Sequence, residues 1–189
     1  WENIRINQLF CVEQGGNYRP ILNLSAPKGD SFNDSIVKGS MDKVQMATAR
    51  QIAQAIVNKG PGCWISKADQ RAAYKSIPIQ LKQLRLQGFR WLSKLFIEAY
   101  LVFGAASSVP TYDCFHRAVL DITRALALPE PNSIYHCLDD AIFLSSSKEE
   151  NKRLVDTYRR VGGLLNMSLA SEEDKDKAFS LRQQSKILG

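Results

Sequence analysis

The stretch from Ile134 to Leu144 reads Ile-Tyr-His-Cys-Leu-Asp-Asp-Ala-Ile-Phe-Leu, an apolar segment interrupted by two adjacent aspartates. Apolar residues on both sides of a polar pair predict two short strands, with Asp139 and Asp140 at the bend of a hairpin. Aspartate is common in turns because its carboxylate accepts hydrogen bonds from nearby backbone amides. The pair alone is therefore explained most simply as an ordinary turn, and its meaning depends on the rest of the chain.

A third aspartate ends another predicted strand earlier in the chain. Residues 63–69 read Cys-Trp-Ile-Ser-Lys-Ala-Asp, so that Asp69 closes a short apolar run. If this strand lies beside the hairpin, three partly desolvated carboxylates are crowded together, which is costly unless cations neutralise them. Hard oxygen ligands of this kind favour Mg²⁺, and two such ions can promote an in-line displacement at phosphorus.

The composition is that of an ordinary globular protein with a modest basic excess. The 189 residues are 44% hydrophobic and 23% charged, with a formal net charge of +6 and a pI near 9.2. This excess favours a polyanionic partner such as a nucleic acid but does not require one. The four cysteines form no Cys-x-x-Cys pair and there are only two histidines. This pattern argues against a zinc site or a disulfide framework and indicates an intracellular protein.

The ends of the chain and its hydropathy give two further expectations. No apolar run is long enough to cross a bilayer, and no signal peptide opens the chain, so we expect no membrane partner. The chain begins at Trp1 without a methionine and stops at Gly189 within a pattern. We therefore expect it to be part of a longer protein.

Periodicity and punctuation predict an α+β fold in which hairpins outnumber β-α-β crossovers. The predicted elements are short strands and loops over 7–40, a helix over 41–58, a strand over 63–69, a hairpin over 84–102 with its turn near 93–94, a helix from about 105 to 128, a hairpin over 134–144 and a helix over 148–165. The architecture that fits best is an antiparallel sheet with helices packed on one face.

Six segments resemble the motifs of reverse transcriptases, and they occur in the expected order. They are residues 17–25, 67–79, 101–108, 137–140, the pair Gly162-Gly163 with the lysines at 175 and 177, and residues 186–189. Residues 67–79 carry an aspartate, an aromatic residue five positions later and an Ile-Pro-Ile run. Within the family, residues 25–29, 32–34, 83–91 and 174–179 resemble DIRS-type retrotransposons.

The resemblance implies a polymerase palm with part of a fingers subdomain. It assigns residues 1–62, with the helix over 41–58, to the fingers, residues 63–79 and 101–189 to the palm, and residues 80–100 to a hairpin insertion, with the thumb absent. The implied activity is RNA-directed DNA synthesis with Mg²⁺ or Mn²⁺, on a primed RNA or DNA template with deoxynucleoside triphosphates. The implied location is the nucleus or the cytoplasm.

The same resemblance implies a role for each matching residue. Asp69 and Asp139 would be catalytic and hold the metal ions, with Asp140 a secondary ligand or a neighbour that sets the local field. The nucleotide-binding residues would be Arg19 on the triphosphate, Tyr74 as a gate against the ribose 2′-hydroxyl, and Phe103 and Gly104 along the pocket. Lys175 or Lys177 would protonate the leaving pyrophosphate.

Simpler explanations exist for several of these residues. Tyr74 could be a core tyrosine, Arg19 a solvated strand residue, and the two lysines part of a charged loop. Cys137 stands where the family usually has tyrosine, and residues 12–16 lack the family's usual lysines. An inactive module that binds nucleic acid or protein is therefore an alternative. A viral RNA-dependent RNA polymerase is a third, against which Leu138 and Tyr74 argue.

Overall fold

The computed structural model describes residues 3–37, 39, 41, 43–170 and 179–182. Its contacts divide the chain into two compact units, each with its own sheet. The first unit comprises Trp1–Lys43 and Tyr74–Tyr112, and the second comprises Val44–Ala73 and Asp113–Gly189.

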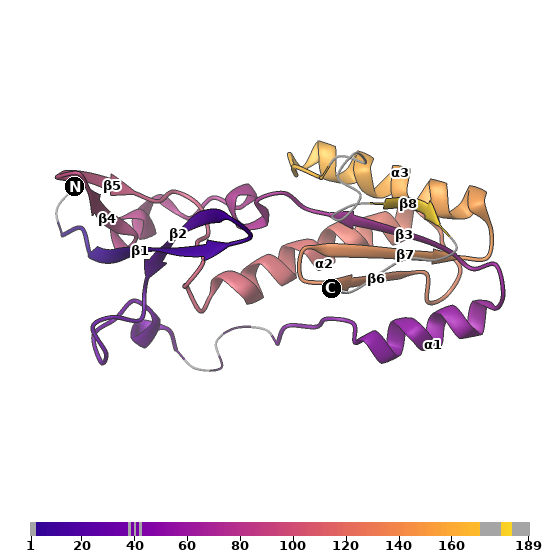
Figure 1. The fold of residues 1–189 in the computed structure, drawn as a ribbon, viewed down its shortest axis with the longest axis horizontal. Coiled ribbons are helices and arrows are strands. Elements are labelled where there is room, and N and C mark those ends of the chain that lie inside the picture. Colours follow the sequence, from indigo (N-terminus) through magenta and orange to yellow (C-terminus); the bar gives the residue numbers. More distant parts are fainter. Residues whose placement is uncertain (1–2, 38, 40, 42, 171–178, 183–189) are drawn as a thin grey trace. The chain divides into compact units, whose positions relative to one another are not determined.

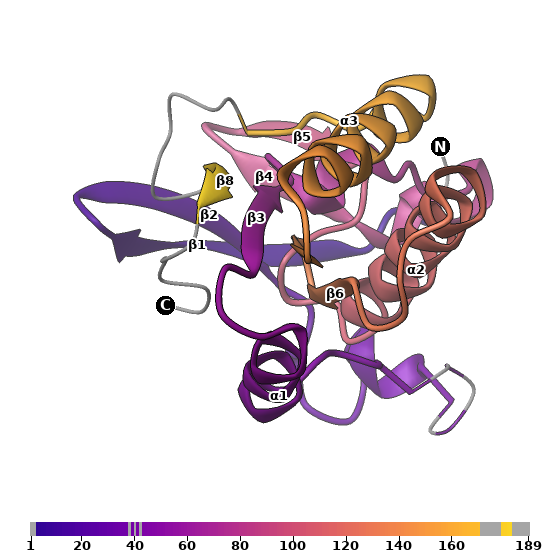
Figure 2. The ribbon, with the colours of Figure 1, turned by 90° about the vertical axis from the view of Figure 1, so that its right-hand side faces the viewer.

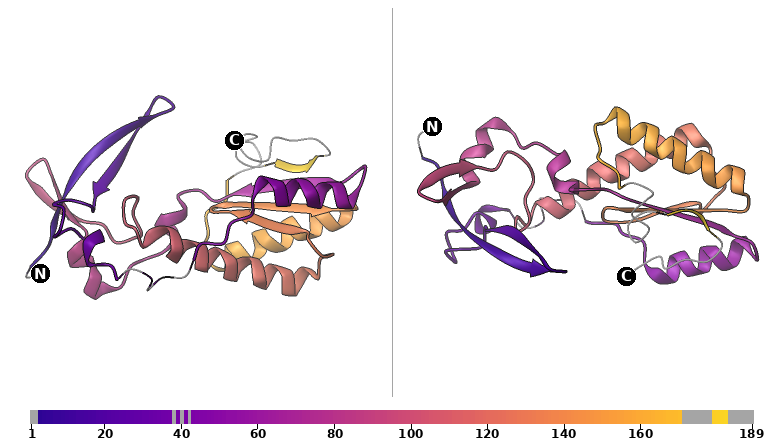
Figure 3. Two further views of the ribbon diagram at one scale, coloured as in Figure 1. Left: turned by 90° about the horizontal axis from the view of Figure 1, so that it is seen from below. Right: turned by 45° about the horizontal axis from the view of Figure 1, so that its top comes forward.

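The first unit is built on a four-stranded sheet in the order β2-β1-β4-β5. The strands are β1 (Ile6–Gln14), β2 (Asn17–Asn23), β4 (Gly88–Trp91) and β5 (Lys94–Ile97). β1 and β2 form the long hairpin seen in Figure 3, closed by two glycines with φ of +59° and +76°. Positive φ at both turn positions is the geometry that matches the twist of a hairpin, and glycine adopts it without strain. Three short 3₁₀ helices, η1 (Asn33–Ser35), η2 (Ala73–Ser76) and η3 (Leu81–Leu86), lie along the connecting segments.

The second unit is built on a fully antiparallel sheet in the order β6-β7-β3-β8. Its strands are β6 (Ile134–Cys137), β7 (Asp140–Ser145), β3 (Trp64–Asp69) and β8 (Phe179–Arg182). Three helices accompany the sheet: α1 (Ala49–Lys59), α2 (Ser108–Ala127, whose first turn belongs to the first unit) and α3 (Lys148–Leu164). The predicted strand over 63–69, the hairpin over 134–144 and the last two helices are thus confirmed to within a few residues.

Helices cover both faces of this sheet, so the prediction of helices on one face was wrong. Ala141 and Phe143 of β7 belong to a core cluster with residues of α2 and α3, whereas Ile142 and Leu144 belong to a cluster with residues of α1. Figures 1 and 2 show α1 on one side of β3 and β7 and α3 on the other. The cause lies in β7 itself, because a continuous apolar strand needs cover on both faces.

The helix predicted over 41–58 begins later, at Ala49, and this part of the prediction was wrong. The Thr48 hydroxyl accepts a hydrogen bond from the Gln51 amide, and the Gln51 side chain accepts one from the Thr48 amide. This reciprocal capping box fixes the first turn of α1. Residues 43–48 before it have no regular secondary structure, and the Ala47 amide donates to the His136 carbonyl of β6. α1 therefore packs within the second unit.

The predicted hairpin over 84–102 is present but shorter. Residues 81–86 form η3, and only β4 and β5 pair as strands, with Leu92 and Ser93 at the turn. Both turn residues have positive φ, +46° and +63°.

Among the described residues, no helix has the length and apolar character needed to cross a membrane.

Candidate active site

The three predicted catalytic aspartates lie at one end of the β6-β7-β3 sheet. Asp69, the last residue of β3, is the direct antiparallel partner of Asp140, the first residue of β7. The turn between β6 and β7 consists of Leu138 and Asp139, because Cys137 pairs with Asp140. The bend is therefore one residue earlier than the predicted pair at Asp139 and Asp140. The backbone brings all three carboxylate-bearing residues together, although Asp69 is distant from the others in sequence.

Backbone hydrogen bonds fix this end of the sheet from two sides. The Gln70 amide donates to the Asp139 carbonyl at 3.2 Å, which ties the end of β3 to the turn. The Ala170 amide donates to the Asp69 carbonyl at 2.8 Å, so the segment after α3 also holds the end of β3. These bonds set the backbone positions of Asp69 and Asp139 independently of what their carboxylates bind.

The turn itself has an unfavourable residue in its tightest position. Leu138 has φ of +54°, and Asp139 is not among the residues with positive φ. A two-residue hairpin with positive φ only at its first position is of the type that prefers glycine there. Leucine in this region costs on the order of 1 kcal/mol, so the surrounding contacts must hold the turn in place.

Lys67 is the direct neighbour of the aspartates on the sheet. Alternation along β3 places Lys67 and Asp69 on one face, and the cross-strand partner Asp140 shares that face. The Lys67 Nζ lies 2.9 Å from Asp140 Oδ1, and both side chains are mostly buried. The ammonium therefore neutralises one carboxylate of the cluster directly.

Neighbouring ionisable groups reveal the concentration of negative charge. Burial, and then the charges of Asp69, Asp139 and Asp140, raise the pKa of the Tyr158 hydroxyl well above its usual range. Burial, and then Asp140 and Asp139, likewise raise the pKa of the Cys137 thiol. Asp140 has a raised pKa mainly because it is buried, with the ion pair to Lys67 opposing the shift. All three carboxylates thus act on the one hydroxyl.

The donor set fits Mg²⁺ by its chemistry, since these carboxylates are the hard oxygen ligands that this ion takes alongside water and phosphate. Among the residues that the structure describes, however, no three Asp, Glu, His or Cys side chains converge closely enough to hold a metal ion. Asp140 is turned towards Lys67. The backbone thus places all three aspartates at one end of the sheet, and the Asp140 side chain is paired with Lys67.

His116, a buried residue of α2, contacts the turn between β6 and β7. His116 Nδ1 lies 2.6 Å from the Leu138 carbonyl oxygen, and Nε2 lies 2.9 Å from the Tyr158 hydroxyl of α3. A carbonyl oxygen only accepts, so Nδ1 carries the proton and donates. Burial lowers the pKa of His116 to about 4, which keeps the ring neutral at pH 7. Nε2 is then an acceptor, and the Tyr158 hydroxyl donates to it.

A second polar contact joins α2 to β6 one helical turn earlier. Asp113 Oδ1 lies 3.0 Å from His136 Nε2, and Asp113 Oδ2 accepts from Arg117 Nε at 3.0 Å and from the Gln45 amide at 3.2 Å. Asp113 and His116 are fully buried. The hydrogen bond from His136, followed by those of its other partners, outweighs burial and lowers the pKa of Asp113.

The predicted nucleotide-binding residues belong to the first unit. Tyr74 is 7% exposed, and its ring centroid lies 4.8 Å from that of Phe103 and 5.8 Å from that of Tyr112. Phe103 is itself 53% exposed. Tyr74 is therefore packed as a core tyrosine would be, but against an aromatic ring that reaches the surface.

Gly104 and Arg19, the other two predicted nucleotide-binding residues, also belong to the first unit. Gly104 has φ of +101°, and a Cβ there would lie 2.5 Å from the Leu22 carbonyl, so only glycine fits. The Asn33 side chain fastens this segment by donating to the Gly104 carbonyl and accepting from the Ala106 amide, each at 2.8 Å. Arg19 is exposed on β2. Lys175 and Lys177, the predicted proton donors, lie outside the described residues.

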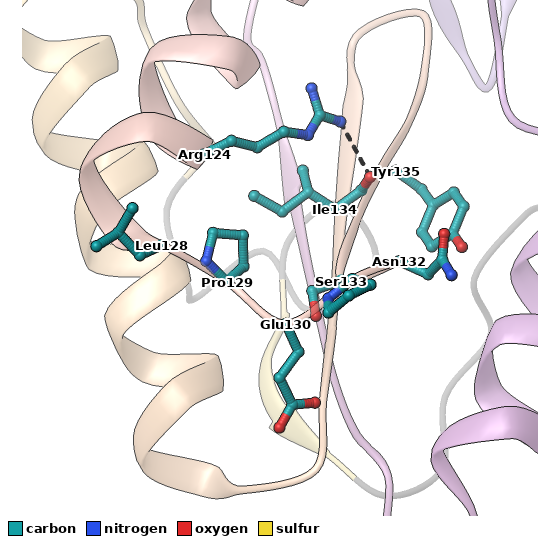
Figure 4. A pocket seen from close by; sticks show the side chains of 9 residues that line it. Arg124, Leu128, Pro129, Glu130, Asn132, Ser133, Ile134 and Tyr135 are labelled. Atoms are coloured by element: carbon teal, nitrogen blue, oxygen red, sulfur yellow. Dashed lines mark hydrogen bonds between the residues drawn. The ribbon is translucent and has the colours of Figure 1, made fainter.

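A cavity of about 530 Å³ lies at the other end of the β6-β7 hairpin from the aspartates. Figure 4 shows it beside Leu128, Glu130 and Tyr135, with Arg124 donating to the Ile134 carbonyl at 3.1 Å. Ile134 is the first residue of β6, whereas Asp139 follows the last. This cavity is thus separate from the candidate active site.

Sequence reasoning missed Lys67, His116 and Tyr158 as parts of the site. The sequence does hold a signal for the last two. His116 and Tyr158 recur at helical spacing among apolar residues of α2 and α3, on the faces that become buried. A buried polar group needs a hydrogen-bond partner, so each predicts a polar contact inside the core. For Lys67, strand alternation relative to Asp69 was the available signal.

Comparison with known proteins supports the fold. No protein-family model and no curated protein matches the chain. Among solved structures, a foamy viral protease-reverse transcriptase in complex with double-stranded DNA matches with a TM-score of 0.77 at 15% identity, over 100% of this chain and 30% of that one. The foamy viral protein in complex with an RNA/DNA hybrid matches with a TM-score of 0.69 at 16% identity, over 94% and 21%.

A third match, again with a foamy viral protease-reverse transcriptase bound to double-stranded DNA, has a TM-score of 0.68 at 15% identity, over 96% of this chain and 34% of that one. The chain thus spans about a third or less of the proteins that it matches. At such identities the likeness concerns the fold. The chain has the fold of part of a retroviral-type reverse transcriptase.

Proposed function

We propose that this chain is the fingers-and-palm part of an RNA-directed DNA polymerase that adds deoxynucleotides to a primer 3′ end. One observation carries the proposal: Asp69, Asp139 and Asp140 meet at one end of a single antiparallel sheet in a fold that matches part of a viral reverse transcriptase. Three carboxylates gathered in this way are costly without cations, and metal-dependent phosphoryl transfer uses such a cluster.

Asp69 and Asp139 would hold two Mg²⁺ ions, with Asp140 beside them in its ion pair with Lys67. Bound there, the ions would activate the attacking hydroxyl and stabilise the charge on the departing pyrophosphate. Asp140 contributes negative charge beside them, while its ion pair with Lys67 limits the repulsion within the cluster. The rigid end of β3 and the turn supply the fixed positions that in-line transfer requires.

The direct test is primer extension by the full-length protein on a primed RNA. We expect incorporation of deoxynucleotides with Mg²⁺, loss of incorporation after chelation, and recovery when Mg²⁺ or Mn²⁺ is added back. A primed DNA of the same sequence compares the two templates. Absence of incorporation on both templates, with both metals and with binding intact, would contradict the proposal.

Tyr74 is proposed to select deoxynucleotides by leaving no room for a 2′-hydroxyl. Replacing it by alanine removes a ring that is buried against Phe103 and Tyr112, and opens space beside the exposed Phe103 ring. We expect Tyr74→Ala to lower the preference for dNTP over rNTP by about 10²-fold, as expected when a steric exclusion worth about 3 kcal/mol is lost. Single-nucleotide incorporation kinetics with matched dNTP and rNTP measure this ratio.

The matched control is Tyr74→Phe, which keeps the ring and removes only the hydroxyl. This variant should discriminate against ribonucleotides as the wild type does. If Tyr74→Ala discriminates equally well, Tyr74 is a core residue and not a gate.

Two structural observations favour the alternative of an inactive binding module. Lys67 engages Asp140, and no group of three metal-ligating side chains converges among the described residues. Such a module would bind primed templates with a salt-dependent affinity and incorporate no nucleotide with any metal ion.

Among reverse transcriptases, we propose the DIRS-type branch because of the resemblance in residues 83–91 and 25–29. We also propose an intracellular location.

A further inference from the structure

The turn that carries Asp139 is held by a histidine that nothing in the proposed chemistry requires. His116 projects from α2 into the core, where it is fully buried, and its Nδ1 donates to the Leu138 carbonyl at 2.6 Å. A buried imidazole is costly unless both nitrogens are engaged, and here the second nitrogen accepts from the Tyr158 hydroxyl at 2.9 Å. Two helices and the turn are thus joined through one ring.

Each of the two turn residues, Leu138 and Asp139, has its carbonyl held by a separate hydrogen-bond donor. The Gln70 amide of the β3 side donates to the Asp139 carbonyl, while His116 donates to the preceding carbonyl of Leu138. Leu138 is the residue with positive φ. Without the bond from His116, the peptide that follows Leu138 could rotate towards a more favourable conformation, and the direction of the Asp139 side chain would change with it.

α2 contacts the β6-β7 hairpin at two points, one on β6 and one at the turn. Asp113 and His116 are three residues apart on the helix, a rise of about 4.5 Å. Their partners His136 and Leu138 are two residues apart, which spans about 6.6 Å along a strand. Asp113 fixes β6 and His116 fixes the turn, and the two histidine rings contact each other edge-on at 5.4 Å. The helix therefore fixes both the position and the tilt of the turn.

We propose that His116 is a positioning residue for Asp139, acting through its Nδ1 hydrogen bond to the Leu138 carbonyl and oriented by Tyr158. The inference rests on the proposed polymerase function for its kinetic consequence, but the hydrogen-bonded state of His116 is independent of it. In this role His116 acts through the backbone of the turn. It determines how often the turn presents Asp139 in the productive direction.

Two substitutions separate the two ends of the ring. His116→Asn keeps an amide N–H near the position of Nδ1 and can still donate to Leu138, whereas His116→Gln places its amide near the position of Nε2, beside Tyr158. Both introduce an uncharged amide into the same buried site. We expect His116→Gln to lower kcat about 10²-fold at unchanged KM for the nucleotide, and His116→Asn to stay within about threefold of wild type, because small misplacements of catalytic groups cost rate.

The thermal midpoint of each variant shows whether it folds. The kcat values of the Asn and Gln variants are compared at a temperature well below both midpoints. Equal losses in the Asn and Gln variants, or no loss in either, would overturn the proposal. Tyr158→Phe gives a third measurement, since the ring remains while the orienting hydroxyl is lost. It should lower kcat in the same direction as His116→Gln, and a wild-type kcat in Tyr158→Phe would show that Tyr158 does not orient the ring.

A measurement without activity distinguishes this inference from the proposed function. Long-range ¹H–¹⁵N spectra of the full-length protein labelled with ¹⁵N-histidine report which ring nitrogen carries the proton. We expect His116 to be neutral with Nδ1 protonated at pH 7, and protonation at Nε2 alone would overturn the inference. If the wild-type protein shows this tautomer yet incorporates no nucleotide, the polymerase proposal fails while the hydrogen bond to the turn stands.

Discussion

Asp139→Asn is expected to lower deoxynucleotide incorporation by the full-length protein by about 10³-fold or more, because removing a metal ligand forfeits several kcal/mol of stabilisation in the transition state. Asp139 is one of two turn residues, and its backbone is fixed by the Gln70 amide. Asparagine fits the same space and keeps the turn propensity. The loss should therefore appear in kcat and in metal dependence, with the fold intact.

Asp140→Asn should have a much smaller effect, about tenfold, which corresponds to an electrostatic change of about 1.4 kcal/mol. The Asp140 carboxylate is engaged by Lys67 at 2.9 Å, and it lies largely buried. Its contribution is a share of the local field. In addition, the substitution leaves the Lys67 ammonium without its partner, so a fall in stability is expected alongside the change in rate.

Single-turnover incorporation on a primed RNA, at several Mg²⁺ concentrations, measures both variants. Asp156→Asn is the matched control, since Asp156 is exposed on α3 and belongs to no part of the site. It should behave as wild type. Equal losses for Asp139→Asn and Asp140→Asn would mean that the ion pair with Lys67 does not separate their roles, and undiminished incorporation by Asp139→Asn would remove it from the catalytic set.

The elements that position the aspartates were predictable because their signals are local. The apolar runs before Asp69 and on both sides of Asp139 specify strands, and their pairing follows once both are assigned to one sheet. The β6-β7 hairpin and α3 were predictable for the same reason, because turn-forming and helix-ending residues lie next to them in the sequence. The bend was misplaced by one residue because leucine in a turn with positive φ is unfavourable, and the sequence alone favours the two aspartates there.

The rest depends on contacts between distant residues. The start of α1 is set by the pairing of Thr48 with Gln51, and the residues just before it are held by the bond from the Ala47 amide to β6. Helices on both faces follow from the double-sided burial of β7. Two contacts of the site could be predicted only by knowing which faces and helices pack together. They are the ion pair of Lys67 with Asp140 and the hydrogen bonds of His116 to Leu138 and Tyr158. No periodicity specifies these partners.

The second large effect concerns acid stability, since the pKa of His116 is about 4 in the folded protein against an ordinary value of 6.5. The unfolded chain therefore binds a proton more readily than the folded one between these values. The resulting contribution to the free energy of unfolding, about 3 kcal/mol, is fully present above pH 6.5 and is lost as the pH falls towards 4. About 2 kcal/mol of it should disappear between pH 7 and pH 5.

Urea unfolding of the full-length protein at pH 7 and pH 5 measures this loss, and His116→Gln is the control because an amide does not titrate. Other groups near His116 also titrate: Asp113 has a lowered pKa, so it too favours the folded state less in acid, whereas Asp140 has a raised pKa and acts in the opposite direction. These carboxylates are present in both proteins, so the difference between wild type and variant isolates the imidazole. The wild type should lose about 2 kcal/mol more than His116→Gln over this interval. Parallel losses would show that the pKa of His116 is not lowered in the folded protein, so that burial does not disfavour its charged form.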